Sequence, residues 1–202
     1  WCDTQPGLVP YTAQCSLHRG QIMRLHGAYD EALGEFARAQ RRYRLEGTTA
    51  PAALALTEQG DVLRIQGKLD EAEDCYRQSA ELGYEPQPGL ALCWLARGRT
   101  PAAVSAMRRL LAETQGPVGR SRMLPGGVHV MVAAALIDEA REHADELAEI
   151  ASLFGNPAVR AMAAYARANV ELASGQVAEA LGQARESTRL WSDIGSPYEA
   201  AR

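Results

Sequence analysis

The sequence predicts an all-α, right-handed solenoid of about five helical hairpins over its 202 residues. Glycine or alanine is followed five residues later by alanine along the whole chain, at intervals of 40, 31, 37 and 40 residues. Periods of this size are typical of stacked helical hairpins, because one hairpin cannot bury its apolar face alone. Aromatic residues make up only 6% of the chain, and small apolar residues let helices approach closely. The five pairs are Gly27/Ala32, Gly67/Ala72, Gly98/Ala103, Ala135/Ala140 and Gly175/Ala180.

Each unit is expected to be a helix, a tight turn at the repeated glycine or alanine, and a second helix. Gly20 and Gly60 each stand seven residues before a turn glycine. Glycine inside a helix costs about 1 kcal/mol relative to alanine, so its recurrence in register predicts a close crossing by the second helix. Trp191 follows Leu190 near the end of the fifth pair, where we expect it to cap the stack against a following unit and to be partly exposed in this sequence alone.

These boundaries predict one helical-repeat domain over residues 1–202. Its units lie at approximately 13–48, 50–83, 89–115, 120–155 and 157–195, and a further helix starts within 196–202. The chain opens on Trp1 without an initiator methionine and shows no leader or membrane-spanning stretch. Ser196 and Pro197 are typical of a helix start, but only five residues follow them. We therefore expect the sequence to come from a longer chain.

The glycine, alanine and aromatic positions resemble the tetratricopeptide repeat over nearly the whole chain. The alanine at the best-kept position of that pattern is Ala32, Ala72, Ala103, Ala140 and Ala180. The sequence departs from the strict period of that family, since the third unit is short and the last two units have Ala144 and Ala184 in place of the aromatic.

The longer, degenerate period and the segment from Glu85 to Leu92 resemble the repeat region of bacterial LuxR-class regulators akin to the maltose regulator. This resemblance implies a signalling ATPase domain before the repeats and a helix-turn-helix domain after them. It implies a regulatory repeat domain that binds a protein or peptide partner, or a small inducer. The alternative is a tetratricopeptide-like assembly scaffold with no link to DNA.

Composition limits the partners of the chain. The net charge is −4 and the isoelectric point is near 5.6, which argues against a nucleic-acid-binding surface, since phosphate neutralisation needs an excess of Lys and Arg. The four cysteines show no paired spacing, and we expect buried, unreactive thiols in a cytoplasmic protein without membrane contact.

No catalytic, nucleotide or cofactor motif is present, and we expect neither an enzyme nor a bound metal. The glycine-bearing segment 116–121 lacks the ending of a phosphate-binding loop, and we interpret it as a loop between units. Glu139 and His143 share a helical face with other acids and could seat a cation, but a solvated acidic face is the favoured interpretation.

A binding groove is predicted from the first-helix positions that line the concave face of tetratricopeptide-like stacks. Asp61 and Arg64 could instead be an ordinary surface pair on the exposed side of a helix, worth a few tenths of a kcal/mol. The predicted groove residues are Gln14, Gln21, Arg24, Thr57, Asp61, Arg64, His129, Tyr165 and Asn169.

Overall fold

The computed structural model describes residues 12–202, which form helices and turns without a strand. Cys2 and its predicted unreactive thiol lie outside these residues. The described helices are α1 (Thr12–Leu25), α2 (Tyr29–Leu45), α3 (Thr49–Ile65), α4 (Leu69–Glu81), α5 (Gly89–Ala96), α6 (Thr100–Glu113), α7 (Pro117–Ala133), α8 (Ile137–Phe154), α9 (Pro157–Ala173), α10 (Val177–Ile194) and α11 (Pro197–Ala201).

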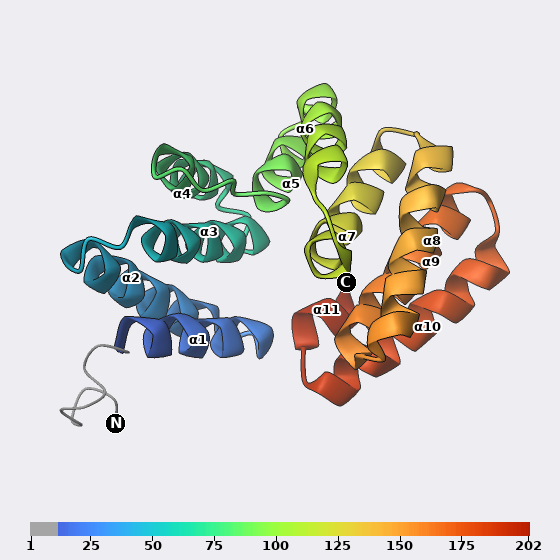
Figure 1. Cartoon of the computed structure of the whole chain (residues 1–202). Helices are drawn as coiled ribbons and strands as arrows, with labels where there is room; N and C mark the ends of the chain where they lie inside the picture. Colours follow the sequence, from blue (N-terminus) through green and yellow to red (C-terminus); the bar gives the residue numbers. More distant parts are fainter. Residues whose placement is uncertain (1–11) are drawn as a thin grey trace. The chain divides into compact units, whose positions relative to one another are not determined.

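The described residues form two compact units that divide within α5: the first ends at Cys93, and the second runs from Trp94 to Arg202. We call the repeats within them hairpins. In the first unit, hairpin α1/α2 packs on hairpin α3/α4 through α2 and α3. In the second unit, α6 packs on α7, and the hairpins α7/α8 and α9/α10 pack through α8 and α9 before the short α11 (Figure 1). One domain over residues 1–202 stays a prediction.

A residue in the left-handed conformation ends the first helix of each hairpin. At Gly67 φ is 77°, the glycine amide donates to the carbonyl of Arg64 at 3.0 Å, and the Lys68 amide donates to the carbonyl of Leu63 at 2.9 Å. This pattern satisfies the last carbonyls of α3 and reverses the chain. Ala135 takes the same place after α7 with φ 57°, although its Cβ disfavours that conformation.

The close crossings predicted at the helix glycines are present in the first unit. A Cβ on Gly20 would lie 2.6 Å from the ring of Phe36 in α2, and a Cβ on Gly60 would lie 2.6 Å from the ring of Tyr76 in α4. Both rings are completely buried. The two glycines therefore make room for the largest side chains of the hairpin cores.

Trp191 is packed rather than partly exposed, so that expectation is wrong. Only 4% of its surface is exposed, because it packs with Ala161 and Leu190 and is also covered by Ala200 of α11. The ring is thus part of the core of the second unit.

The described cysteines lie in or near the core. Cys93 is buried, and its thiol donates to the carbonyl of Leu69 at 3.6 Å. Burial raises the pKa of the half-buried Cys75 thiol to about 11, so this thiol stays protonated at neutral pH. Among residues 12–202, no helix is both long and apolar enough to cross a membrane.

Candidate functional site

Five polar side chains from the first helices of two hairpins gather on one face of the first unit. Gln21 and Arg24 are three residues apart on α1, and Glu58, Asp61 and Arg64 follow the same spacing on α3. Residues three apart lie side by side on a helix. We call these five residues the α1/α3 polar face.

Direct contacts connect the two helices at this face. The Nε2 of Gln21 donates to Oε1 of Glu58 at 2.8 Å. The guanidinium of Arg24 lies 3.4 Å from the Glu58 carboxylate and 3.7 Å from the Asp61 carboxylate. Arg64 lies 3.8 Å from Asp61. The α1/α3 polar face is therefore a connected network that contains two acids and two bases.

The two acids are anchored more deeply than the arginine that spans them. Only 10% of the Glu58 side chain is exposed, compared with 34% for Arg24. The hydroxyl of the buried Tyr76 donates to Oδ1 of Asp61 at 2.8 Å, and burial followed by the Asp61 charge raises the pKa of Tyr76. The neutral hydroxyl therefore holds one Asp61 oxygen in place.

Arg24 keeps donor capacity toward solvent. Both of its ion-pair distances exceed the usual N–H···O range of 2.7–3.2 Å. A guanidinium carries five N–H donors in a planar fork. Arg24 can thus receive a carboxylate or carbonyl oxygen while the carboxylates behind it keep it oriented.

The predicted groove residues of the first unit differ in exposure: Gln14 lies on the surface, whereas Thr57 is buried. Gln14 is exposed and connects through His18 to Gln21, with contacts of 3.4 Å and 3.0 Å. Thr57 is buried, because its hydroxyl bonds to Ser79 at 2.9 Å and to the carbonyl of Ala53 at 3.2 Å. Thr57 therefore cannot line a groove, and its prediction is corrected.

Three groove residues were predicted in the second unit, and only two of them, Tyr165 and Asn169, lie together. His129 is exposed on α7. Tyr165 and Asn169 are half-buried on α9, where Nδ2 of Asn169 donates to the carbonyl of Tyr165 at 2.7 Å. Both line a cavity of about 460 Å³ between α9, α10 and α11.

Sequence reasoning missed Glu58, which is central to the α1/α3 polar face. The sequence did contain a pattern that could have identified Glu58, since this residue stands three positions before Asp61 in the same predicted helix. The spacing places both carboxylates on one face. The cross-helix contact with Gln21 depends on how α1 and α3 pack, which the pattern alone does not give.

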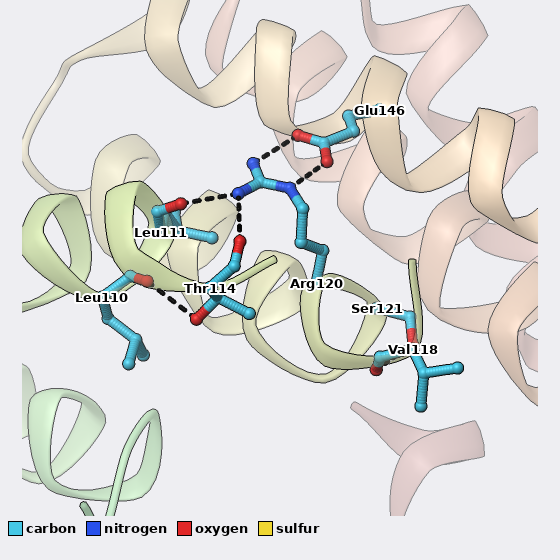
Figure 2. Close-up of polar contacts among 7 residues, drawn as sticks. All are labelled: Leu110, Leu111, Thr114, Val118, Arg120, Ser121 and Glu146. Atoms are coloured by element: carbon cyan, nitrogen blue, oxygen red, sulfur yellow. Dashed lines mark hydrogen bonds and ion pairs between the residues drawn. The ribbon is translucent and has the colours of Figure 1, made fainter. Parts of the chain in front are cut away.

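Arg120 joins three helices of the second unit. As Figure 2 shows, its guanidinium pairs with both carboxylate oxygens of Glu146 on α8 and donates to the carbonyls of Leu111 and Thr114 at the end of α6. The distances to the two carbonyls are 2.6 Å and 3.3 Å. Arg120 thereby satisfies carbonyls left unpaired at a helix end.

The segment 116–121 is not the loop that the sequence predicted. Gly116 precedes α7, and Pro117 is its first residue, so Arg120 and Ser121 are helical. Proline suits this position because its fixed φ is helical and its missing N–H needs no partner there.

Arginines of neighbouring helices pair with three of the six acids of α8. Glu139 pairs with Arg108 at 2.5 Å, and Asp145 pairs with Arg167 at 2.5 Å. Hydrogen bonding from Arg120 lowers the pKa of Glu146. No group of acids, histidines and cysteines within residues 12–202 is placed to hold a metal ion.

Comparisons with known proteins identify the fold. Two solved structures of a Podosopora anserina putative kinesin light chain with nearly identical TPR-like repeats, one of them a variant with a single substitution, match with TM-scores of 0.55 and 0.56. Each is 14% identical in sequence, and the matches cover 92% and 91% of this chain and 97% of each neighbour.

The fold is an all-α, tetratricopeptide-like solenoid. This confirms the predicted fold class. No family model matches the sequence, and no curated protein matches it. At 14% sequence identity, the structural similarity identifies the fold and does not identify a function.

Proposed function

We propose that this chain is a protein-interaction scaffold whose α1/α3 polar face binds a segment of a partner protein. The observation that carries the proposal is Arg24, a partly exposed guanidinium held by two anchored carboxylates. Such a group is oriented before binding, so less side-chain entropy is lost when a partner docks. Stacked repeats commonly use such surfaces for recognition.

The expected ligand presents a carboxylate or backbone carbonyl to Arg24 and donors to the acids beside it. The Tyr76 hydroxyl donates to only one of the two carboxylate oxygens of Asp61. Because a carboxylate can accept several hydrogen bonds, the other oxygen can accept one from a ligand. A peptide segment carries both kinds of group. We further propose a binding rather than a catalytic role, without a cofactor or nucleic acid.

Affinity measurements on matched variants test the proposal. A partner captured by the tagged chain is purified, and its affinity is measured by calorimetry. Arg24→Ala combined with Arg64→Ala should weaken binding by roughly tenfold or more, since arginine is enriched among the few interface residues that each contribute more than about 1 kcal/mol. The matched control is Arg77→Ala with Arg189→Ala, which removes two arginines that are more than half exposed.

Both double variants should retain the helical circular dichroism of the parent, because none of the four arginines lies in the hydrophobic core. Equal affinities of the parent and the Arg24/Arg64 variant would reject the α1/α3 polar face as the binding site.

A finer proposal is that the scaffold belongs to a bacterial LuxR-class transcriptional regulator. Its support is the sequence resemblance around residues 85–92 together with the acidic balance of the chain. A gel shift at low salt tests it: this chain alone should not retard DNA, whereas a longer protein that contains a helix-turn-helix domain should. Salt-sensitive DNA binding by this chain alone would reject that division of roles.

A further inference from the structure

The first turn of α5 lies against the acid that both arginines of the α1/α3 polar face approach. A Cβ added to Gly89, the first residue of α5, would overlap Oδ1 of Asp61 and would lie 2.7 Å from the hydroxyl oxygen of Tyr76. Gly89 is buried and belongs to the first unit. Its backbone therefore covers the carboxylate oxygen to which the Tyr76 hydroxyl donates.

Gly89 provides space rather than an unusual backbone conformation. Its φ is not among the positive values of the described glycines, so alanine can adopt its backbone conformation. The chain around it is fixed, because Pro86 and Gln87 are buried and Oε1 of Gln87 accepts from the Ala91 amide at 2.9 Å. Helix α5 is thus anchored, and an added methyl group would displace the carboxylate or the hydroxyl instead.

The preceding hairpin has different residues at all three positions. Counted from the turn glycines, the residues at the places of Asp61, Tyr76 and Gly89 are Gln21, Phe36 and Glu58. There the Glu58 side chain reaches Gln21 directly, at 2.8 Å, so the repeat does not require glycine at this position. In the next hairpin the three residues differ together: an acid, a hydroxyl that donates to it, and a glycine that lets α5 approach both.

Asp61 connects this arrangement to the arginines. Its Oδ2 lies 3.7 Å from Arg24 on α1, and its Oδ1 lies 3.8 Å from Arg64 on α3. A displaced carboxylate would therefore change the orientation of both guanidiniums. Binding groups generally have to be held within about 0.5 Å of their productive positions by the residues behind them.

We propose that Gly89 is a positioning residue of the α1/α3 polar face. It holds the Asp61 carboxylate in place, and Asp61 in turn orients Arg24 and Arg64 for a segment of the partner protein. This inference rests on the proposed function of that face and extends the site to α5, which contributes space rather than a side chain. The role needs no contact between Gly89 and the partner.

Nuclear magnetic resonance of the arginine side chains tests the positioning role without a partner. The Nε–Hε signals of Arg24 and Arg64 are assigned by their loss in the single alanine variants. Gly89→Ala should shift both signals, because the signal of a guanidinium responds to its hydrogen-bond partners. The signal of Arg38 on α2, which pairs with Glu35 instead, should stay in place.

Tyr76→Phe tests the same role without adding bulk to the core. The preceding hairpin already has Phe36 at this position, so the variant should fold. Loss of the hydroxyl should shift the same two arginine signals. In an Asp61→Ala background, neither Gly89→Ala nor Tyr76→Phe should shift them further, because both substitutions act through the carboxylate that is then absent.

The consequence for binding is measured by calorimetry with the purified partner protein used for the Arg24 and Arg64 variants. Gly89→Ala should weaken its affinity by roughly three- to tenfold, the loss expected when a side chain must be ordered on binding. The matched control is Gly127→Ala, where an added Cβ would lie 2.9 Å from Leu111 in the second unit. That variant strains a different helix crossing and should leave the affinity unchanged.

Unshifted arginine signals in a folded Gly89→Ala variant would overturn the proposal, as would shifts that persist in the Asp61→Ala background. If Gly89→Ala does not fold, unshifted signals in Tyr76→Phe overturn it instead. Parent affinity of Gly89→Ala, together with weak binding by Arg24→Ala with Arg64→Ala, would reject the positioning role and leave the α1/α3 site standing. Parent affinity of that double variant would reject the proposed function itself.

Discussion

Substitution of Gly60 by alanine should destabilise the first unit although alanine is the better helix former. Gly60 lies inside α3, and an added Cβ would lie 2.6 Å, 2.9 Å and 2.9 Å from three atoms of the Tyr76 ring. That ring is completely buried and its hydroxyl is bound to Asp61. The ring can therefore move only by disturbing its neighbours and its hydrogen bond.

Three contributions set the size of the effect. Overpacking of a core costs roughly 1–3 kcal/mol, and weakening of a hydrogen bond to a charged group costs up to about 1.5–3 kcal/mol. Replacing a helical glycine by alanine returns about 1 kcal/mol. Together these contributions span about 0–5 kcal/mol, depending on how far the hydrogen bond is weakened, and we expect Gly60→Ala to lower the free energy of unfolding by about 2–3 kcal/mol, near the middle of that range.

Gly34→Ala is the matched control in the same unit. Gly34 also lies inside a helix, α2, but an added Cβ would meet no atom within 4 Å. This variant should gain about 0.5–1 kcal/mol from helix propensity alone. Urea unfolding followed by far-ultraviolet circular dichroism measures both variants. If Gly60→Ala is as stable as Gly34→Ala, the close crossing of α3 and α4 at Tyr76 is wrong.

Two further perturbations test the second unit. Ala135→Gly should stabilise it by about 0.5–1 kcal/mol, because glycine adopts the left-handed conformation of this turn without the Cβ penalty; a lower melting temperature would contradict the assigned turn. Glu146→Gln should lower the melting temperature at pH 7 and have little effect at an acidic pH below the lowered pKa of the folded-state carboxylate, where Glu146 is protonated. The reason is that Arg120 lowers the pKa of Glu146 in the folded state, so the pair stabilises the fold at neutral pH and loses that contribution as pH falls through the lowered pKa. The same loss at both pH values would assign the effect to packing instead of charge.

Repeat spacing predicted the fold class because it encodes backbone conformations that few residues can replace. The turn glycines and the helix glycines Gly20 and Gly60 mark positions where a Cβ is strained or has no room. These local requirements appear directly in the sequence. The start of α7 was missed because Gly116 and Pro117 also suit a loop, and proline at a first helical position was the signal that could have corrected it.

The candidate site was only partly predictable for a different physical reason. Position along α1 and α3 placed Gln21, Arg24, Asp61 and Arg64 correctly on one face. Whether a polar side chain meets solvent or another helix depends on packing, however. The Thr57 hydroxyl bonds to Ser79 on α4, and three acids of α8 pair with arginines on α6, α7 and α9. No short-range sequence pattern predicts these contacts.

Site-specific photocrosslinking tests the central claim most directly, because it shows where a partner protein touches the chain. A benzophenone amino acid replaces Gln14, which is exposed beside the α1/α3 polar face, and in a second variant it replaces Arg77, which is exposed on α4. The account predicts that the captured partner crosslinks to position 14 and not to position 77, and that Arg24→Ala with Arg64→Ala removes the product. Crosslinking at position 77 alone, or a product at position 14 that survives the double substitution, would contradict it.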